Sequence, residues 1–258
     1  MIMNILETII AKKQLEVAAG KETGYLESLN KTNRPHLSLK KALESSSTGI
    51  IAEFKRKSPS KGWIYPDADA TEIPSGYEKA GATALSILTD ESFFGGSLKD
   101  LQTARPLVNI PILRKDFIID PYQLHVAKTI GADVILLIAT ALDKKSCASL
   151  AKEAKSLGLE VLLEIHEESE LEYITPDIDI VGINNRNLKS FVTNVETSFQ
   201  LGEKIPDGYL KISESGISDP HTIKELRAAG FKGFLIGETF MKDDNPAQEL
   251  AKFINVLA

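Results

Sequence analysis

Short apolar runs alternate with amphipathic stretches along the chain, and the same kind of segment recurs at multiples of about 25 residues. Four of the apolar runs are rich in leucine or β-branched residues and begin at Gly81, Gly131, Gly158 and Gly230. Glycine at such a point favours the end of a helix before a tight connection into a strand. The runs show no clean polar alternation, which is typical of parallel strands covered by helices on both faces. The pattern therefore predicts repeated βα units.

Completing the pattern predicts eight strands. They cover residues 50–55, 84–88, 111–115, 134–138, 160–164, 180–184, 210–213 and 234–236. Amphipathic segments between them predict helices, among them residues 121–130, 143–157 and 219–229. Eight such units in about 250 residues match a (β/α)8 TIM barrel, of the α/β class. A doubly wound sheet is the structural alternative.

Residues 1–49 precede the first predicted strand and are expected to form a helical extension packed on the barrel. Asn4 and Glu7 have the spacing of a capping box, which predicts a helix from Asn4. An apolar stripe on this helix comprises Ile2, Ile5, Leu6 and Ile9. We expect a single domain over residues 1–258. The polar segment 56–69, after the first strand, is long enough to move over a site.

Composition and charge narrow the class of function. Hydrophobic residues make up 43% and charged residues 26% of the 258 positions, as in ordinary folded domains, which excludes a disordered or fibrous protein. The net charge of −6 argues against a general nucleic-acid binder. No apolar run approaches the roughly 20 residues of a membrane span. Charges also interrupt any signal-peptide core near the N-terminus. We therefore expect a cytoplasmic protein without membrane contact.

Cysteine and histidine give no sign of a metal centre. The single Cys147 lies in a helical pattern and is expected to be a small buried hydrophobe rather than a nucleophile, in a reducing compartment. The four histidines lack metal-ligand spacing, so no metal is expected. The sequence does not fix the oligomeric state, and a monomer is the simplest expectation.

Charged side chains lie where the predicted strands end, which is where this fold carries its catalytic groups. Glu53 and Lys55 share the face of Ile51, because side chains two apart in a strand point the same way. An ordinary ion pair is the alternative interpretation of these two charges. Other strand ends carry Arg114, Lys115, Asp116, Glu164, Asn184, Asn185, Arg186, Glu214, Ser215, Gly216, Gly237 and Glu238.

Strand parity separates neighbouring side chains. Lys115 shares a face with Leu113 and is expected to point into the barrel. Arg114 is then a surface residue that faces the helices, with its stem packed on apolar neighbours. Asn184 and Arg186 share parity, and they are favoured over Asn185.

The loops after strands seven and eight suggest a phosphate site. Ser215, Gly216, Gly237 and Glu238 lie at the usual phosphate position of the fold. Their backbone N–H groups can bind a dianion without a dedicated cation.

The motifs that contain these residues resemble the indole-3-glycerol phosphate synthase family. EFKRKSPSKG at 53–62 is the most specific of them. The resemblance continues in FFGGS at 93–97, LRKDFI at 113–118, LE at 163–164, GINNRNL at 182–188, SESGI at 213–217 and LIGE at 235–238. It spans the whole chain, including the extension.

This resemblance implies a carbon–carbon lyase of tryptophan biosynthesis. The family converts 1-(2-carboxyphenylamino)-1-deoxyribulose 5-phosphate into indole-3-glycerol phosphate, carbon dioxide and water, without a cofactor. Lys115 would be the general acid in ring closure and Glu164 a base or proton carrier in dehydration. Lys55 would hold the substrate carboxylate and act as a later acid, with Glu53 orienting it. The resemblance does not fix which lysine performs which protonation.

The same resemblance implies binding roles. Asn184 and Arg186 would bind hydroxyl and carboxylate groups, and Ser58 in the first loop would help to hold the substrate. Phe94 and Phe117 would pack against the aromatic ring. The phosphate would lie at Ser215, Gly216, Gly237 and Glu238. The carboxylate of Glu238 would repel phosphate, so its side chain is expected to turn away.

Two alternatives stay open. One is a related phosphate-binding barrel such as phosphoribosylanthranilate isomerase. That reaction would need a base such as cysteine, and an aspartate, at the strand ends. A non-catalytic sensor of phosphorylated ligands would lack the strand-end lysines and glutamates.

Overall fold

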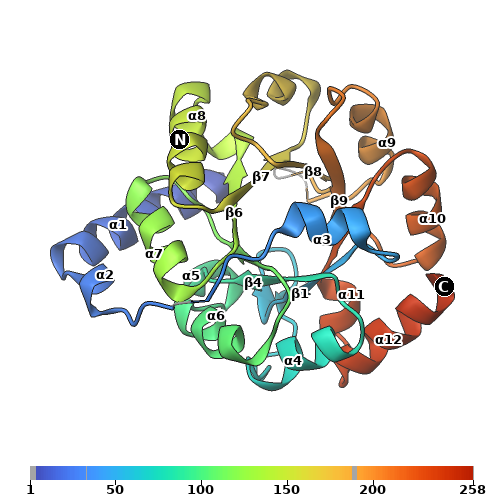
Figure 1. Ribbon diagram of the computed structural model, residues 1–258, viewed down its shortest axis with the longest axis horizontal. Helices are drawn as coiled ribbons and strands as arrows, with labels where there is room; N and C mark the ends of the chain where they lie inside the picture. Colours follow the sequence, from blue (N-terminus) through green and yellow to red (C-terminus); the bar gives the residue numbers. More distant parts are fainter. Residues whose placement is uncertain (1–3, 33, 188–190, 258) are drawn as a thin grey trace.

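The computed structural model describes residues 4–32, 34–187 and 191–257. Its centre is a closed barrel of eight parallel strands, ordered β1-β10-β9-β8-β7-β6-β5-β4 around the ring (Figure 1). The strands are β1 (Ile50–Phe54), β4 (Ala84–Leu88), β5 (Ile112–Lys115), β6 (Val134–Ile138), β7 (Glu160–Ile165), β8 (Ile180–Asn184), β9 (Leu210–Glu214) and β10 (Gly233–Ile236). The predicted TIM barrel is confirmed, because a doubly wound sheet would be open.

Helices follow the strands and surround the barrel (Figure 1). They are α4 (Glu72–Lys79), α5 (Glu91–Phe94), α6 (Leu98–Ala104), α7 (Pro121–Ile130), α8 (Lys144–Ser156), α9 (Glu196–Gly202), α10 (Pro220–Ala228), α11 (Glu238–Met241) and α12 (Pro246–Leu257). Short 3-10 turns cover η1 (Arg105–Leu107), η2 (Ala139–Ala141) and η3 (Glu168–Tyr173). Local sequence explains α7 well. Asp120 caps it in a capping box with Gln123, and Gly131 ends it with a φ of 93°.

Two apolar layers hold the barrel together. One lies inside the ring and includes Ile51, Leu113 and Leu235. The other lies between the strands and the helices and includes Ile50, Ala52 and the side chains of the surrounding helices. Successive residues of β1 therefore alternate between the layers, as the strand period requires.

The N-terminal extension contains α1 (Ile5–Glu22), α2 (Tyr25–Ser28) and α3 (Leu39–Ser45). The predicted capping box is present, because Asn4 Oδ1 accepts from Glu7 N and Asn4 N donates to Glu7 Oε2, both at 2.9 Å. Ile2, the first residue of the predicted stripe, lies outside the described residues.

The extension reaches both ends of the barrel. Leu39 and Leu43 of α3 pack with residues at the starts of the strands, such as Ile51 and Ile180, and close that end. Figure 1 shows α3 lying over the ring and α1 at its edge beside α7. The apolar residues of α1 line a pocket at the other end, described below.

The segment after β1 is more ordered than its polar sequence predicted. β2 (Lys57–Ser58) and β3 (Gly62–Trp63) form an antiparallel hairpin. Arg56 anchors its base by donating two hydrogen bonds, of 2.7 and 2.9 Å, to the carboxylate of Asp100. Strands of two residues are too short to give a periodic signal, so the sequence pattern could not reveal them.

Two smaller expectations concern the helices. Cys147 in α8 is buried, and burial raises the pKa of its thiol to about 11, as expected for a structural cysteine. Among the residues that the structure describes, none of the helices has the length and apolar character to cross a membrane.

Candidate active site

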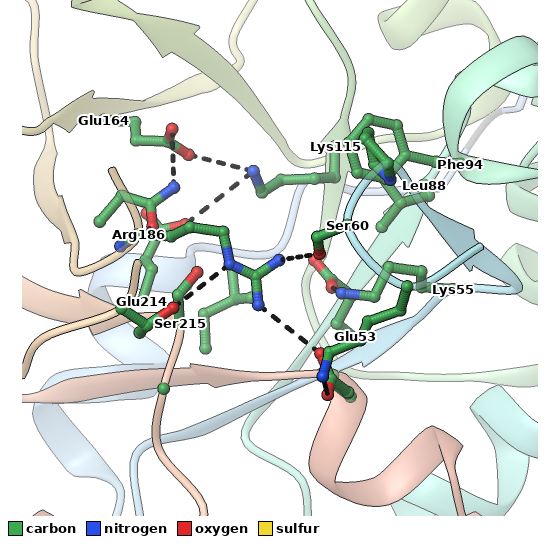
Figure 2. A pocket seen from close by; sticks show the side chains of 18 of the residues that line it. Glu53, Lys55, Ser60, Leu88, Phe94, Lys115, Glu164, Arg186, Glu214 and Ser215 are labelled. Carbon is green, nitrogen blue, oxygen red and sulfur yellow. Dashed lines mark hydrogen bonds and ion pairs between the residues drawn. The ribbon is translucent and has the colours of Figure 1, made fainter. Parts of the chain in front are cut away.

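A pocket of about 700 Å³ opens at the carboxyl ends of the barrel strands (Figure 2). This volume is typical of a small-molecule site. Its walls include every predicted site residue except Ser58, namely Glu53, Lys55, Phe94, Lys115, Phe117, Glu164, Asn184, Arg186, Ser215, Gly216, Gly237 and Glu238. The fold thus gathers the ends of separate strands into one site.

Glu53 and Lys55 form a close pair on one side of the pocket. Lys55 Nζ lies 2.7 Å from Glu53 Oε1, and the two side chains are 11% and 6% exposed. Ser86 Oγ in the neighbouring strand donates to Glu53 Oε2 at 3.4 Å. Glu53 and Lys55 therefore form an ion pair, and the same two side chains also line the pocket. The ion-pair interpretation and the functional-site interpretation of this strand end are both correct.

Lys115 reaches the centre of the pocket, where Figure 2 shows it pointing toward Glu164 and Glu214. Its Nζ donates to Glu164 Oε2 at 3.0 Å and lies 4.0 Å from Glu214 Oε2. Asn184 Nδ2 donates to the other oxygen of Glu164 at 3.0 Å. Leu113 belongs to the apolar layer inside the ring, which confirms that Lys115 points inward.

The two buried carboxyl groups beside Lys115 differ in protonation. Burial raises the pKa of Glu214 to about 8, and the negative charge of Glu164 adds to the shift. Burial acts the same way on Glu164, but the positive charges of Lys115 and His166 outweigh it and hold its pKa well below the usual range. Lys115 would lose affinity for its proton through burial, yet Glu164 and Glu214 raise its pKa. At neutral pH the site therefore contains charged Lys115, ionised Glu164 and protonated Glu214.

His166 stands behind Glu164 and was not predicted from the sequence. Its Nε2 lies 3.3 Å from Glu164 Oε1, and its Nδ1 lies 3.6 Å from Glu170 Oε2. Burial alone would lower the pKa of this imidazole, but its close contacts with the carboxylates of Glu164 and Glu170 raise the pKa to about 9. The ring is therefore a cation at neutral pH and helps to keep Glu164 ionised.

Arg186 crosses the pocket mouth. Its backbone N donates to Asn184 Oδ1 at 3.0 Å, and Nη1 donates to Ser60 Oγ at 3.3 Å. Nη2 lies 3.6 Å from Glu238 Oε2, and Lys61 Nζ lies 3.8 Å from Glu238 Oε1. The expectation that the Glu238 side chain turns away is therefore wrong, because these two cations hold its carboxylate at the pocket wall.

Asn185, which parity excluded, is buried behind the strand. Its Nδ2 donates to Ser213 Oγ at 3.0 Å, and its Oδ1 accepts from Ser198 Oγ at 2.8 Å. These contacts hold α9 against the outside of the barrel. The choice of Asn184 and Arg186 as pocket residues agrees with the structure.

Two aromatic rings form an apolar wall. Phe94 is the last residue of α5 and Phe117 follows β5, and their ring centroids are 6.0 Å apart with planes inclined by 38°. Leu88, at the end of β4, lines the same pocket. A flat aromatic group can pack against such a wall.

The opposite part of the pocket contains the predicted phosphate residues. Ser215 and Gly216 both have positive φ, 66° and 75°, so the chain turns sharply after β9. A side chain at Gly216 would also collide with Thr193, which makes glycine necessary there. Lys61 and Lys242 also line the pocket. The sequence suggested that backbone N–H groups would bind phosphate without a dedicated cation, whereas the structure places two lysines in this pocket.

Two predictions about neighbouring residues are corrected by the structure. Ser58 is 1% exposed, and its Oγ accepts from Lys61 N at 3.2 Å inside the hairpin, whereas Ser60 lines the pocket. Arg114 faces away from the barrel interior as expected, but it is 4% exposed rather than on the surface. Asp116 Oδ2 accepts from its Nη2 at 2.8 Å, and this pairing allows the guanidinium to be buried.

Comparison with known proteins agrees with these features. The family model described as Indole-3-glycerol phosphate synthase matches residues 6–253. The chain belongs to the indole-3-glycerol phosphate synthase family. The resemblance stated from the motifs is confirmed, and with it the activity, that of a carbon–carbon lyase that decarboxylates its substrate in tryptophan biosynthesis.

Two relatives that carry the family name cover almost the whole chain. The one from Bacteroides thetaiotaomicron is 57% identical over 257 residues, which cover 98% of this chain and 99% of the relative. The one from Burkholderia ambifaria is 41% identical over 256 residues, which cover 96% and 98%. Both are named Indole-3-glycerol phosphate synthase.

A solved structure of tryptophan synthase subunit alpha from Legionella pneumophila superimposes with a TM-score of 0.60. It covers 84% of this chain and 98% of that chain, at 13% sequence identity. At this identity the likeness shows the barrel fold alone.

The structure adds residues to the site that sequence reasoning left without a role. Glu214 ends β9 and shares parity with Ile212, which lies inside the ring, so strand parity alone is enough to predict that it points into the pocket. Ile5, Leu6 and Ile9 also line the pocket. Their stripe was visible in the sequence, but no local signal says at which end of a barrel an N-terminal helix lies.

Proposed function

We propose that this pocket carries out the reaction of the indole-3-glycerol phosphate synthase family, with the residue roles given below. The observation that carries the proposal is the position of Lys115 between two carboxyl groups of opposite protonation state. Pairs of titratable groups whose environments drive their pKa values apart are typical of acid–base sites. Such a site can donate and accept protons at the same pH.

Ring closure requires a proton donor for the carbonyl oxygen. As the aromatic carbon attacks the ribulose carbonyl, negative charge develops on that oxygen. Lys115 stabilises the charge and donates its proton as the new carbon–carbon bond forms. Glu214 lies 4.0 Å from Lys115 Nζ and holds a proton at neutral pH, so it can resupply the amine.

Decarboxylation and dehydration complete the reaction. Lys55, oriented by Glu53 at 2.7 Å, holds the substrate carboxylate before carbon dioxide leaves. It then protonates the departing hydroxyl group, and ionised Glu164 accepts the remaining proton. His166 stabilises the charge that Glu164 must carry to act as this base.

The binding roles follow the walls of the pocket. Phe94 and Phe117 pack against the aromatic ring, while Asn184 and Arg186 bind hydroxyl and carboxylate groups. The phosphate lies at the other side, at the backbone of Ser215, Gly216, Gly237 and Glu238. Lys61 and Lys242 add positive charge there, which offsets the carboxylate of Glu238. Ser58 supports Lys61 from behind, and Ser60 takes the substrate contact.

The test is turnover by the purified chain. We expect conversion of the carboxyphenylamino substrate to a product with indole fluorescence, with an unchanged rate after dialysis against EDTA, because every proposed group belongs to the protein. Absence of turnover between pH 6 and pH 9 would contradict the proposal. Tight binding without turnover would favour a sensor, and isomerisation of phosphoribosylanthranilate would favour the related isomerase.

We also propose that the enzyme is a cofactor-independent monomer with one domain over residues 1–258, and that it works in the cytoplasm. The continuous family match over residues 6–253 supports one domain. The buried, high-pKa thiol of Cys147 suits a reducing compartment. Light scattering should give a mass near 28.2 kDa, and a dimer mass or a periplasmic location in cell fractionation would overturn these points.

A further inference from the structure

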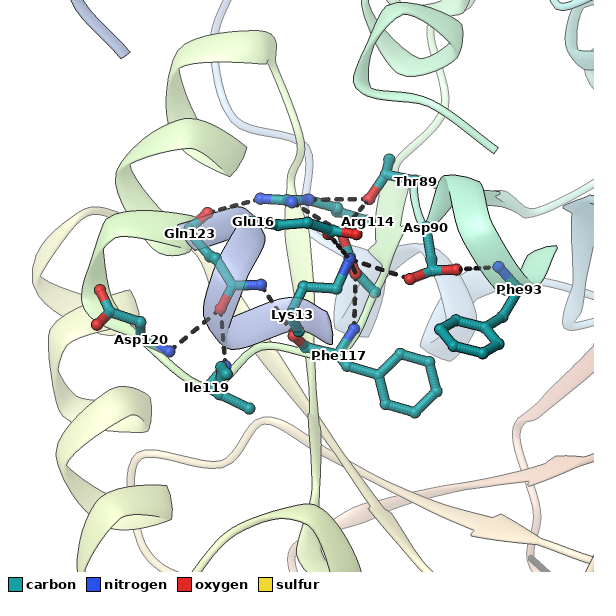
Figure 3. Close-up of polar contacts among 11 residues, drawn as sticks. Lys13, Glu16, Thr89, Asp90, Phe93, Arg114, Phe117, Ile119, Asp120 and Gln123 are labelled. Atoms are coloured by element: carbon teal, nitrogen blue, oxygen red, sulfur yellow. Dashed lines mark hydrogen bonds and ion pairs between the residues drawn. The ribbon is translucent and has the colours of Figure 1, made fainter. Parts of the chain in front are cut away.

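A lysine of the N-terminal extension is buried at the mouth of the barrel. Lys13 of α1 is 4% exposed, and its Nζ lies 3.0 Å from Asp90 Oδ2 and 3.0 Å from Asp116 Oδ1 (Figure 3). It also donates to Glu16 Oε2 at 2.6 Å. One ammonium thus joins α1 to the segments that follow β4 and β5. None of the reaction steps above uses it.

The two aspartates have a second task, because each also accepts a backbone hydrogen bond next to the pocket. Asp90 Oδ1 accepts from Phe93 N at 2.8 Å and caps α5, the helix that ends at Phe94. Asp116 Oδ1 accepts from Phe117 N at 2.8 Å, and Asp116 itself stands between Lys115 and Phe117. Both partners of Lys13 therefore hold the segments that carry the aromatic wall and the central lysine.

Lys13 lies on the apolar face of α1. Ile9, Leu6 and Ile5 precede it by four, seven and eight residues, so they lie on the same face of the helix. All three line the pocket. The face of α1 that carries the anchored ammonium is therefore the face that lines the substrate site.

The surrounding charges show what the ammonium balances. Burial would lower the pKa of Lys13, but Asp116 and Asp90 raise it, so the group stays charged. Burial would raise the pKa of Asp116, yet Arg114 and Lys13 lower it to about 2. Without Lys13, Asp116 would keep Arg114 as its counter-charge, whereas Asp90 would lose the ion pair that the described residues provide for it. Buried ion pairs add little stability compared with apolar packing, and their best attested use is to specify one arrangement.

We propose that Lys13 is a positioning residue for substrate binding: by joining Asp90 and Asp116 it locks α1 in the rotation that makes Ile5, Leu6 and Ile9 a wall of the pocket. Lys13 touches no reacting atom. The proposal concerns the shape of the site, and it stands even if the proton-transfer roles given above are reassigned.

Replacement of the charge tests the proposal. In Lys13→Met we expect KM to rise on the order of tenfold while kcat changes less than about threefold, because binding is lost rather than chemistry. Hydrogen exchange of the amides of residues 5–12 should become faster. Lys21→Met is the matched control, since Lys21 joins the same helix to Asp120 at 2.8 Å through an exposed pair. Its KM should stay within twofold of the original value.

A double variant separates positioning from simple charge balance. Lys13→Met with Asp90→Asn removes the uncompensated carboxylate, and asparagine still caps α5. We expect the double variant to recover thermal stability but to keep the raised KM. Recovery of KM together with stability would overturn the proposal, as would an unchanged KM in Lys13→Met.

Two further results are decisive. If Lys13→Met does not fold, the KM of the double variant is compared with that of Asp90→Asn alone, and equal values refute the proposal. If the unmodified enzyme shows no turnover, the proposed function fails instead. Hydrogen exchange of α1 then decides whether Lys13 fixes the helix, and unchanged exchange refutes it.

Discussion

The two ends of the barrel both contain buried carboxylates, and these groups differ in the partners that surround them. At the closed end, Asp133 Oδ2 accepts from Arg105 Nη1 at 2.7 Å and from Ile112 N at 2.9 Å. Its Oδ1 accepts from Leu37 N at 2.8 Å. At the open end, Glu214 is equally buried, yet its Oε1 has no hydrogen-bond partner in the described part of the chain.

This difference teaches how one fold separates stability from chemistry. The closed-end carboxylate is held by fixed groups, including backbone N–H groups of the extension and of β5, so both of its oxygens already have donors within the protein. Glu164 at the open end is contacted by side chains instead, since Lys115 Nζ and Asn184 Nδ2 donate to its two oxygens. Substrate atoms can replace such partners, whereas a backbone amide stays in place.

The largest predicted effect is a loss of stability caused by a substitution at the closed end. Asp133→Asn leaves the guanidinium of Arg105, whose side chain is 5% exposed, without its counter-charge. Loss of one partner of a buried pair should lower the free energy of unfolding by about 3–5 kcal/mol. For a chain of this size the melting temperature should fall by roughly 10 °C. Calorimetry checks this value, with exposed Asp207→Asn as the control.

The same variant should keep its chemistry. Measured below its melting temperature, kcat of Asp133→Asn should stay within about twofold of the original value, because the closed end lies away from the pocket. A large loss of kcat with an unchanged melting temperature would reverse the assignment of the two ends.

The fold followed from the sequence to within one residue at each strand boundary. The spacing of the βα units and the glycines at the helix ends can both be recognised from local sequence. Eight such units leave few other topologies in which all the strands are buried. Parity then placed Lys115 and Asn184 correctly, because it depends only on the alternation of side chains along a strand.

The remaining site features depend on contacts between distant segments. Burial of Arg114 needs Asp116 and the cover of α7, the place of Ser58 needs a two-residue strand pairing, and the orientation of Glu238 needs Lys61. Each is decided by a partner that arrives only when the chain folds. Composition and residue spacing do not show which distant residues will come into contact.

The next predicted effect is a loss of kcat caused by a substitution at the open end. Lys115→Met removes the proposed proton donor of ring closure, and kcat should fall on the order of 10² or more. Substrate binding should weaken much less, because the ring and phosphate contacts remain. Steady-state fluorescence assays give both values, with exposed Lys152→Met as the control. An unchanged kcat would remove Lys115 from the acid role.

The last effect sharpens the comparison through pH. Glu214 has a folded-state pKa of about 8, raised by burial and by Glu164 from an ordinary value of 4.5. Between these two pH values the unfolded chain releases the proton while the folded chain keeps it, so ionisation disfavours folding. The stability of the unmodified enzyme should therefore fall as pH rises from about 4.5 to 8.

Glutamine at this position has a similar shape and does not titrate. The melting temperature of Glu214→Gln relative to the original chain should increase by up to roughly 10 °C from pH 5 to pH 8.5 and level off above that range. Exposed Glu225→Gln should show no such trend. A constant difference for Glu214→Gln would mean that Glu214 is ionised in the folded enzyme at neutral pH, and Lys115 would then lack the neighbouring proton that ring closure is proposed to use. Glu214 thus lowers the stability of the fold at neutral pH. Its buried, protonated carboxyl group stands beside Lys115, where the proposed reaction needs a proton donor.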